Sequence, residues 1–349
     1  MKKSTLILKA GCLVVFPFTE TLLELLYGRR AAQTPLVKPI IVIGSNRSGT
    51  SLLYSLLANH PDSYAPSSLT EHFPHHPFSA SLLRRILGKS NPVYHAVPQT
   101  TGVVAGGRFP PSEVVSYWEE HLGSWGGGWA NAPDDYFSDE DLDDDTREIL
   151  PLDLKKRIFI MHRKRLLIKQ PGFSYKIKYL NALFPDAIFV HSVRHPISNF
   201  ASIKDRKVFH NDPDWGFRIL GRETDECSPD VLEARELVRL YETIQRDIRQ
   251  IENGARRYVP VRYENLQTEF VPEVERLFRA CELEPPPVVV QNPDWFVRRK
   301  NSQGVRREGA SDPQARQILE QLAQQMGYPA SPHSGAQPGD LAGPELARR

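Results

Sequence analysis

The stretch that decides the fold reads "IIVIGSNRSGTSLLYSLL" and runs from Ile40 to Leu57. Its first four residues are apolar and β-branched, which predicts a buried strand. Two glycines, Gly44 and Gly49, enclose a polar loop, and leucines then recur at helical spacing. A loop between a strand and a helix directs backbone N–H groups and the positive end of the helix dipole at one point. The sequence therefore predicts an anion site at the start of this helix.

The loop differs from that of nucleoside triphosphatases, which reads G-x-x-x-x-G-K-[ST]. Here Gly49 is followed by Thr50 and Ser51, and the cation, Arg47, lies inside the loop. A planar guanidinium binds phosphate or sulfate oxygens well, and the hydroxyls of Ser48, Thr50 and Ser51 add donors. These residues predict a site for phosphate or sulfate that is not built for ATP.

The composition is that of an ordinary globular protein, with 349 residues, 40% hydrophobic and 25% charged. A net charge of +2 argues against a nucleic-acid-binding surface spread over the molecule, so we expect no nucleic-acid partner. Three widely separated cysteines indicate neither a disulfide framework nor the spacing of metal ligands. We therefore expect a reducing compartment and no metal.

Residues 1–38 form an apolar or amphipathic N-terminal segment. Two lysines precede its apolar stretch as in a signal peptide, but Lys9 interrupts the stretch too early for such a peptide. Glu20 and Glu24 end it before the roughly 18 apolar residues that a membrane span needs. We predict an uncleaved helix packed on the core and a cytoplasmic location. A helix on a membrane surface, making a peripheral contact, is the alternative.

Later segments alternate between strand and helix patterns. A β-rich run ends at Val193, Pro196 suits the first turn of a helix, and residues 257–266 read as another strand. This alternation predicts an α/β three-layer sandwich with a central parallel sheet. Residues from about 60 to 150 are rich in Pro, His, Trp and Gly, and we expect them to form an acceptor-site or lid insertion. Residues 330–349 have no apolar period and are predicted to be disordered.

A second anion element lies at the end of the strand that precedes Pro196. Arg194 follows this strand, and Ser202 lies eight residues later on the predicted helix. Ligands of an open parallel sheet bind at the carboxyl ends of its strands. With the first loop, this pair predicts a ligand carrying two separated phosphates. Taken singly, Arg194 would be a surface ion-pair residue and Ser202 an ordinary helix serine.

These motifs together resemble the sulfotransferases that use 3′-phosphoadenosine 5′-phosphosulfate (PAPS). In that family an "R-S-G-T-[ST]" loop holds the 5′-phosphosulfate and an Arg…Ser pair eight apart holds the 3′-phosphate, matched here by "NRSGTS" and "VRHPISNFAS". The resemblance continues through "LLIKQPG", "FPDAIFVHSVRHP" and "VRYENL" and spans residues 39–329. Asn265 departs from the family's usual aspartate, and residues 304–309, "GVRREG", are the nearest match to its C-terminal Arg-Lys-Gly loop.

The resemblance implies a P-loop-like sulfotransferase domain over residues 39–329, with PAPS as co-substrate and no metal. Its acceptor would be a hydroxyl, or second an amine, of a glycan, a lipid or a small metabolite. Arg47 and Lys169 would stabilise the transferred group, because sulfuryl transfer, like phosphoryl transfer, places charge on the oxygens. The resemblance assigns donor binding to Ser45, Asn46, Arg47, Ser48, Gly49, Thr50, Ser51, Arg194, Ser202 and Tyr263.

A hydroxyl acceptor also needs a base to remove its proton. In the glycan-modifying branch of the family a glutamate follows the second strand, which implies Glu71 in "SSLTEHFPHH". Cytosolic members use a histidine at a position that is Pro171 here. We predict Glu71 as the base and His72 as the second choice.

Two other functions remain open at this point. A P-loop kinase or triphosphatase would share the fold, but the Gly-Lys-[ST] sequence is missing and no magnesium-holding aspartate is evident. A non-catalytic nucleotide-binding protein would keep the anion site without turnover. The sequence does not identify the acceptor or the oligomeric state.

Overall fold

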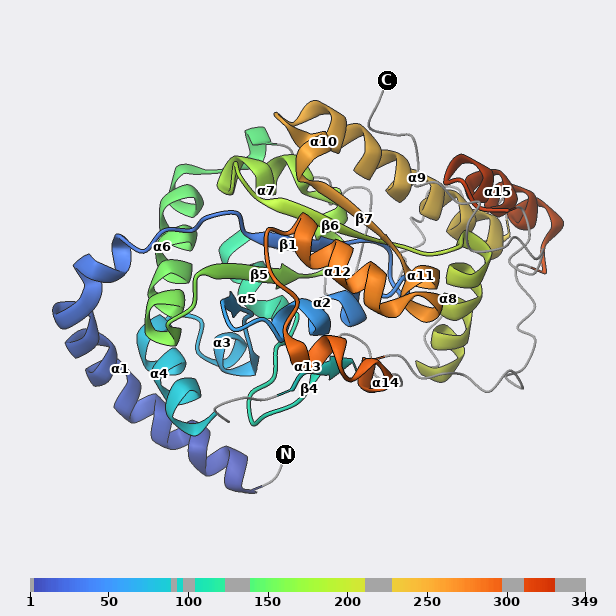
Figure 1. Cartoon of the computed structure of the whole chain (residues 1–349). Helices are drawn as coiled ribbons and strands as arrows, with labels where there is room; N and C mark the ends of the chain where they lie inside the picture. The colour runs from blue at the N-terminus through green and yellow to red at the C-terminus, as the bar shows by residue number, and fades with distance from the viewer. Residues whose placement is uncertain are drawn as a thin grey trace.

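The computed structural model describes residues 3–88, 93–96, 104–122, 139–210, 228–296 and 311–329. Its centre is a five-stranded parallel sheet with the strand order β2-β5-β1-β6-β7 (Figure 1). The strands are β1 (Ile40–Ile43), β2 (Ser63–Tyr64), β5 (Arg165–Lys169), β6 (Ile188–Val193) and β7 (Tyr258–Arg262). Two further short strands, β3 (His95–Ala96) and β4 (Val104–Ala105), pair antiparallel outside this sheet.

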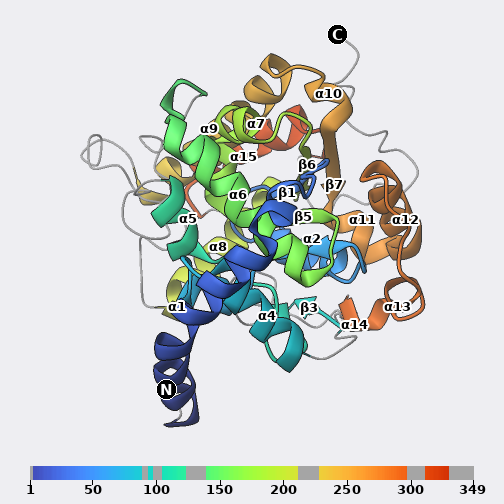
Figure 2. The ribbon, with the colours of Figure 1, turned by 90° about the vertical axis from the view of Figure 1, so that its left-hand side faces the viewer.

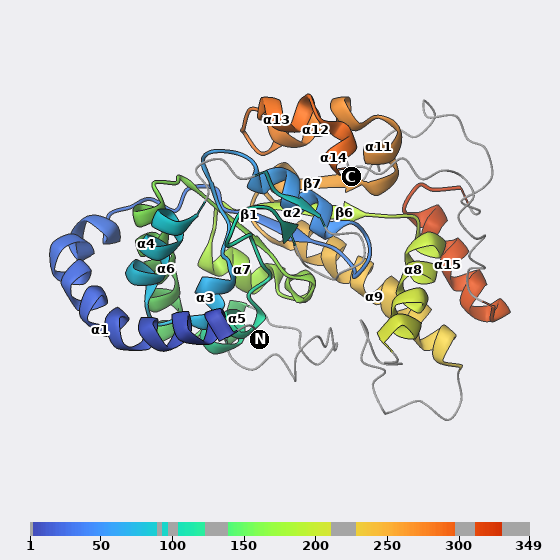
Figure 3. The ribbon, with the colours of Figure 1, turned by 90° about the horizontal axis from the view of Figure 1, so that it is seen from below.

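Helices cover both faces of the sheet because alternate strand residues point to opposite sides. Ile41 and Ile43 of β1 face one core, whereas Ile40 and Val42 face the other. Figure 3 shows α12 and α13 on one side of the sheet and α7 and α9 on the other. The predicted three-layer α/β sandwich with a central parallel sheet is therefore confirmed.

The first face is covered by α5 (Val115–Leu122), α6 (Asp144–Met161), α7 (Ile177–Leu183) and α9 (Pro229–Gln250). The second face is covered by α2 (Thr50–Ala58), α11 (Tyr263–Thr268), α12 (Phe270–Ala280), α13 (Pro287–Val290) and α14 (Pro293–Phe296). Short helical turns complete these regions: η2 (Asp139–Asp141), η3 (Pro171–Tyr175) and α10 (Gly254–Arg257).

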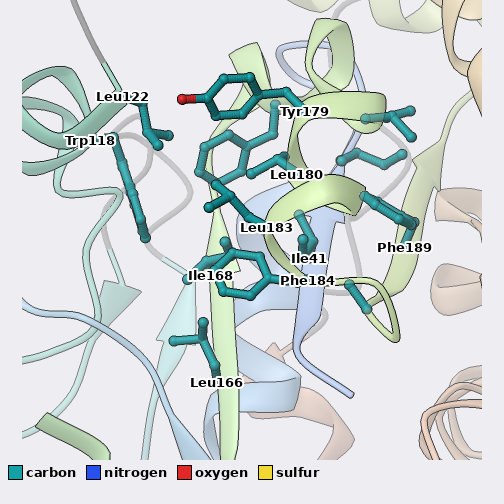
Figure 4. Close-up of a cluster of buried hydrophobic side chains, with 14 of the residues drawn as sticks. Ile41, Trp118, Leu122, Leu166, Ile168, Tyr179, Leu180, Leu183, Phe184 and Phe189 are labelled. Carbon is teal, nitrogen blue, oxygen red and sulfur yellow. The ribbon is translucent and has the colours of Figure 1, made fainter. Parts of the chain in front are cut away.

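The core on the first face joins the sheet to segments distant in sequence (Figure 4). Ile41 and Phe189 extend from the sheet toward Leu180 of α7, and Trp118 of α5 closes the cluster. All four side chains are buried. Truncating the Phe189 side chain to Ala would cost about 3 to 5 kcal/mol of unfolding free energy, as is usual for a buried aromatic residue.

A separate cluster of packed helices lies beyond the carboxyl end of β6. There α8 (Pro196–His210) and α15 (Pro313–Gln325) pack on α9 through apolar side chains such as Phe200, Leu237 and Leu319. This cluster holds α8 in a fixed position relative to β6. The segment between β6 and α8, which contains Arg194, is therefore supported on both sides.

The N-terminal helix α1 (Lys3–Ala32) packs on α4 (Pro77–Leu87) and α6, and a short helix α3 (Ser68–His72) lies nearby. Phe16 and Ala31 are buried on its inner side, as the predicted packing on the core requires. Figure 2 shows α1 running along the outside of these helices. None of the helices in the described ranges is long and apolar enough to cross a membrane.

Some sequence-based boundaries need correction or lie outside the described residues. The strand predicted through residue 266 ends at Arg262, because Tyr263 begins α11, whose Leu266 packs in the second core. Residues 60–150 include β2, an edge strand of the central sheet, in addition to α3, α4 and α5. The "GVRREG" segment and residues 330–349 lie outside the described ranges, so those predictions stay untested.

Candidate functional site

The loop between β1 and α2 can be formed only with glycine at both of its ends. Gly44 has a φ of 136° and Gly49 a φ of 112°, which side-chain-bearing residues rarely adopt. A Cβ on Gly44 would lie 2.7 Å from the carbonyl oxygen of Ser192, and one on Gly49 would lie 2.6 Å from the ring of Tyr263. The loop therefore lies against β6 and the start of α11.

Hydrogen bonds fix the shape of this loop. The Ser48 hydroxyl donates to the Ser45 carbonyl at 2.7 Å, and the Ser192 hydroxyl donates to the Ser48 carbonyl at 3.0 Å. The Gly44 N–H donates to the Ser174 hydroxyl at 2.9 Å. Because Gly49 at the N-cap has no side chain to cap α2, the first N–H groups of this helix can bind an anion.

The structure brings the two anion elements together. The Arg47 Nε donates to the Ser202 hydroxyl at 3.3 Å, and Arg194 Nη1 donates to the Arg47 carbonyl at 2.8 Å. Asn199 of α8 links the same segments, since it accepts from the Ser45 hydroxyl at 2.9 Å and donates to the Asn46 carbonyl at 2.8 Å. The sequence did not single out Asn199, although its position between Arg194 and Ser202, on the same helix as Ser202, was a usable signal.

Tyr263 completes this side of the site. The Arg194 guanidinium lies over its ring, 4.9 Å from the centroid, in a cation–π contact. The same ring lies where a side chain at Gly49 would be. Tyr263 thus keeps the Arg194 guanidinium close to the loop.

A pocket opens beside this junction between β6, α8, α9 and α15. Ser45, Arg194 and Asn199 line its polar side, and apolar residues of the helices line the other: Leu237, Leu240, Ile244, Leu322 and Met326. His191 also faces the pocket, and its Nδ1 lies 2.7 Å from the Tyr258 hydroxyl. Burial lowers the pKa of His191 to about 3, so this side chain is neutral at physiological pH.

Lys169 reaches the other side of the loop from the end of β5. Its side chain is 2% exposed, and its Nζ donates to the Ser51 hydroxyl at 3.3 Å. Burial, and then the positive charge of Arg47, lower the pKa of Lys169 to about 7. Arg47 and Lys169 therefore both lie at the N-terminus of α2, where their positive charges would favour the binding of an anion.

Glu113 is a residue that the sequence did not reveal. Its carboxylate forms an ion pair with Lys169, and the side chain is 7% exposed. The second carboxylate oxygen, Oε2, is buried and has no hydrogen-bond partner among the described residues. No motif marks Glu113, and 56 residues separate it from Lys169, so only the folded chain brings the two together.

The segment around Glu113 is firmly held and locally strained. The Ser112 N–H donates to the Pro66 carbonyl at 3.0 Å, and the Trp118 indole donates to the Glu113 carbonyl at 2.9 Å. Val114 has a φ of 44°, an unfavourable conformation for a β-branched residue. Strain of this kind often accompanies functional sites. Here it lies directly beside a buried carboxylate.

Glu71, the predicted base, lies on α3 and is partly exposed. Its Oε1 accepts from the Ser116 hydroxyl at 3.2 Å, and Ser116 follows Glu113 by three residues. Glu71 is therefore hydrogen-bonded to the same segment of chain that contains Glu113. His72 is exposed at the end of α3, and nothing in the structure tests it as a base.

Known protein families include one that matches this chain. A model of the sulfotransferase family matches residues 39–287. Two curated relatives, from Mycobacterium bovis and Mycobacterium tuberculosis, are both named omega-hydroxy-beta-dihydromenaquinone-9 sulfotransferase Stf3. Each is 26% identical over 195 residues, or 50% of this chain and 46% of the relative. The chain thus spans about half the length of the curated relatives it matches.

Two solved structures are also similar to this chain. The sulfotransferase STF9 from Mycobacterium avium has a TM-score of 0.49 and 17% identity, covering 76% of this chain and 69% of its own. The sulfotransferase STF1 from Mycobacterium tuberculosis H37Rv has a TM-score of 0.48 and 16% identity, covering 92% of this chain and 86% of its own.

Proposed function

The chain belongs to the sulfotransferase family, and we propose that it transfers the sulfuryl group of PAPS to a hydroxyl group of an acceptor. One observation carries the proposal: the glycine-bounded loop with Arg47 is hydrogen-bonded to both Arg194 and Ser202. A donor with phosphates at two positions of one ribose needs two anion sites side by side. The junction supports the proposal because it holds Arg47, Arg194 and Ser202 next to one another.

In the proposed complex the loop binds the 5′-phosphosulfate. The N–H groups of residues 45–51 and the hydroxyls of Ser48, Thr50 and Ser51 would donate to its oxygens. Arg194 and Ser202 would bind the 3′-phosphate. The Ser202 hydroxyl would then donate to the phosphate and would no longer accept the 3.3 Å hydrogen bond from Arg47 Nε. The adjoining pocket, apolar on one side and polar on the other, would receive part of the nucleoside.

Arg47 and Lys169 would stabilise the charge that develops during transfer. The bond between sulfur and the bridging oxygen breaks, and a bond forms between sulfur and the acceptor oxygen. Lys169 contacts the Ser51 hydroxyl near the start of α2 and senses the charge of Arg47, so both cations would face the leaving and equatorial oxygens. The bound anion would also raise the pKa of Lys169 and keep it protonated. The products are adenosine 3′,5′-bisphosphate and a sulfate ester.

The acceptor proton would pass to a carboxylate. Glu71 remains the predicted base, and Glu113 is the second candidate because it contacts Lys169 and has an unpaired oxygen within the described part of the chain. The two carboxylates differ in surroundings, since Glu113 is buried and Glu71 is partly exposed. Their amide variants can therefore be compared directly.

For the acceptor we propose a hydroxylated lipid first, and a glycan or small metabolite second. The relatives from Mycobacterium carry the name of a lipid quinone with an omega-hydroxyl group, which supports the lipid class for this chain. No metal takes part in the proposed step.

The test uses the purified full chain with PAPS labelled in its sulfuryl group and a panel of hydroxylated lipids, glycans and metabolites. We expect label in one class of acceptor, together with stoichiometric release of adenosine 3′,5′-bisphosphate. Phosphoryl transfer from ATP with magnesium would support a kinase instead. Binding of PAPS without turnover on every acceptor would support a non-catalytic nucleotide-binding protein.

A further inference from the structure

We propose that α1 binds to the surface of a membrane that contains anionic lipids. The helix has two apolar faces, and the protein covers only one of them. Phe16, Leu23, Tyr27 and Ala31 pack inward against α3, α4 and α6. The opposite face carries six exposed large apolar side chains, which are Val14, Val15, Phe18, Leu22, Leu25 and Leu26.

These six side chains form one stripe. Val14, Phe18, Leu22 and Leu25 are spaced by three or four residues, so they lie on one side of the helix. Phe18 is 82% exposed and Leu25 is 80% exposed, although both are large apolar residues. α1 lies at the outer edge of the molecule in Figures 1 and 3, so a flat surface can reach this stripe.

Glu20 and Glu24, which interrupt the apolar run and argue against a membrane span, both contact the protein. Glu20 accepts hydrogen bonds from the N–H groups of Phe78 and Ser79, at 3.0 and 2.8 Å, at the start of α4. Glu24 forms an ion pair with Lys156 of α6 at 2.7 Å. Their charges therefore stabilise the packing of α1 on the protein and are not presented by the exposed stripe.

The charges that do lie with the stripe are positive. Arg29 and Arg30 are exposed in the last turn of α1, and Arg29 continues the same spacing after Leu25. An apolar stripe flanked by arginines matches the interface of an anionic lipid leaflet, where apolar side chains enter and guanidinium groups meet phosphate. A second protein copy would instead need charges complementary to these arginines.

The inference depends neither on the donor nor on the reaction, and vesicle flotation of the full-length protein tests it. We expect the wild-type protein to float with vesicles of phosphatidylcholine and phosphatidylserine, and less with phosphatidylcholine alone. The double variant Phe18→Glu/Leu25→Glu should bind roughly tenfold or more weakly, because it removes two apolar contacts and adds repulsion. Arg29→Glu/Arg30→Glu should remove the preference for phosphatidylserine.

Trp295→Glu is the matched control, because Trp295 is 53% exposed on α14, which lies across the molecule from α1 in Figure 1. This variant should bind vesicles like the wild type, and circular dichroism should show an unchanged thermal midpoint for all variants. No flotation of the wild type, or an equal loss in Trp295→Glu, would overturn the proposal. Light scattering without vesicles that shows a dimer broken by Phe18→Glu/Leu25→Glu would assign the stripe to a second copy instead.

Discussion

The two sides of the site are built in different ways. The proposed donor side consists of loops directly after β1 and β6, and backbone groups, two glycines and hydrogen bonds define its shape. The other side consists of long side chains, Lys169 and Glu113, which come from distant segments and meet as an ion pair. Backbone groups suit a fixed ligand, whereas side chains that carry protons suit the chemical step. Variants on the proposed donor side should therefore change ligand affinity, whereas variants on the other side should change kcat.

The largest effect is expected for the carboxylates. Glu71→Gln, or Glu113→Gln if the buried residue is the base, should lower kcat by roughly a hundred- to ten-thousand-fold, as loss of a general base does. Affinity for adenosine 3′,5′-bisphosphate should stay near wild type in both variants. Steady-state rates with labelled PAPS and calorimetry measure the two quantities. Near-normal kcat in both folded variants would mean that neither carboxylate is the base, and His72 would be examined next.

A smaller effect is expected at Lys169. Lys169→Met should lower kcat by roughly a hundred- to a thousandfold, because a preorganised cation is lost from the transition state. Since the pKa of Lys169 in the free enzyme is about 7, kcat/KM for PAPS should fall as pH rises through this value and the ammonium loses its proton. Lys169→Arg keeps its charge and should not show this fall. A wild-type profile that stays flat from pH 6 to pH 9 would contradict the assignment, given that the fall is expected near 7.

Arg194 tests the donor side alone. Arg194→Ala should cost about 1.5 to 3 kcal/mol of affinity for adenosine 3′,5′-bisphosphate, the usual value of a hydrogen bond to a charged group. Calorimetry with adenosine 5′-phosphate is the control, because this ligand lacks the 3′-phosphate and its affinity should change little. Equal losses for both ligands would show that Arg194 does not contact the 3′-phosphate.

The smallest effect concerns the shape of the loop. Gly49→Ala should cost about 1 to 3 kcal/mol of unfolding free energy, because φ is 112° and the added carbon would lie 2.6 Å from the Tyr263 ring. Gly172→Ala is a comparison at a glycine without a positive φ, where the three atoms nearest to the new carbon all belong to the Gln170 side chain. Chemical denaturation measures both. Equal stability of the two variants would mean that the loop can move away from Tyr263.

The meeting of the two segments on the proposed donor side could be predicted from the sequence because its signals are local. Gly44 and Gly49 stand directly after a strand of β-branched residues, and Arg194 and Ser202 are separated by one helical segment. The parallel sheet then brings the strand ends to one edge. The sequence therefore predicted which segments meet, but not that Asn199 links them.

The other side could not be predicted because its contacts depend on tertiary structure. Glu113 follows no motif, and its pairing with Lys169 arises only when the segment from Pro111 to Trp118 folds over the end of β5. The direction of Glu20 and Glu24 is a second example. In the sequence they only interrupt an apolar run, whereas in the structure they face α4 and α6 and leave the stripe of α1 free of acids.

The central claim is that the junction of the loop with Arg194 and Ser202 binds a nucleotide with a 3′-phosphate. Calorimetry of the wild-type protein with adenosine 3′,5′-bisphosphate, adenosine 5′-phosphate and magnesium ATP tests it most directly. We predict that the bisphosphate binds tighter than adenosine 5′-phosphate by roughly tenfold or more, since the 3′-phosphate adds charged hydrogen bonds. ATP with magnesium should bind more weakly than the bisphosphate. Equal affinity for the two adenosine phosphates, or tighter binding of magnesium ATP, would contradict the account.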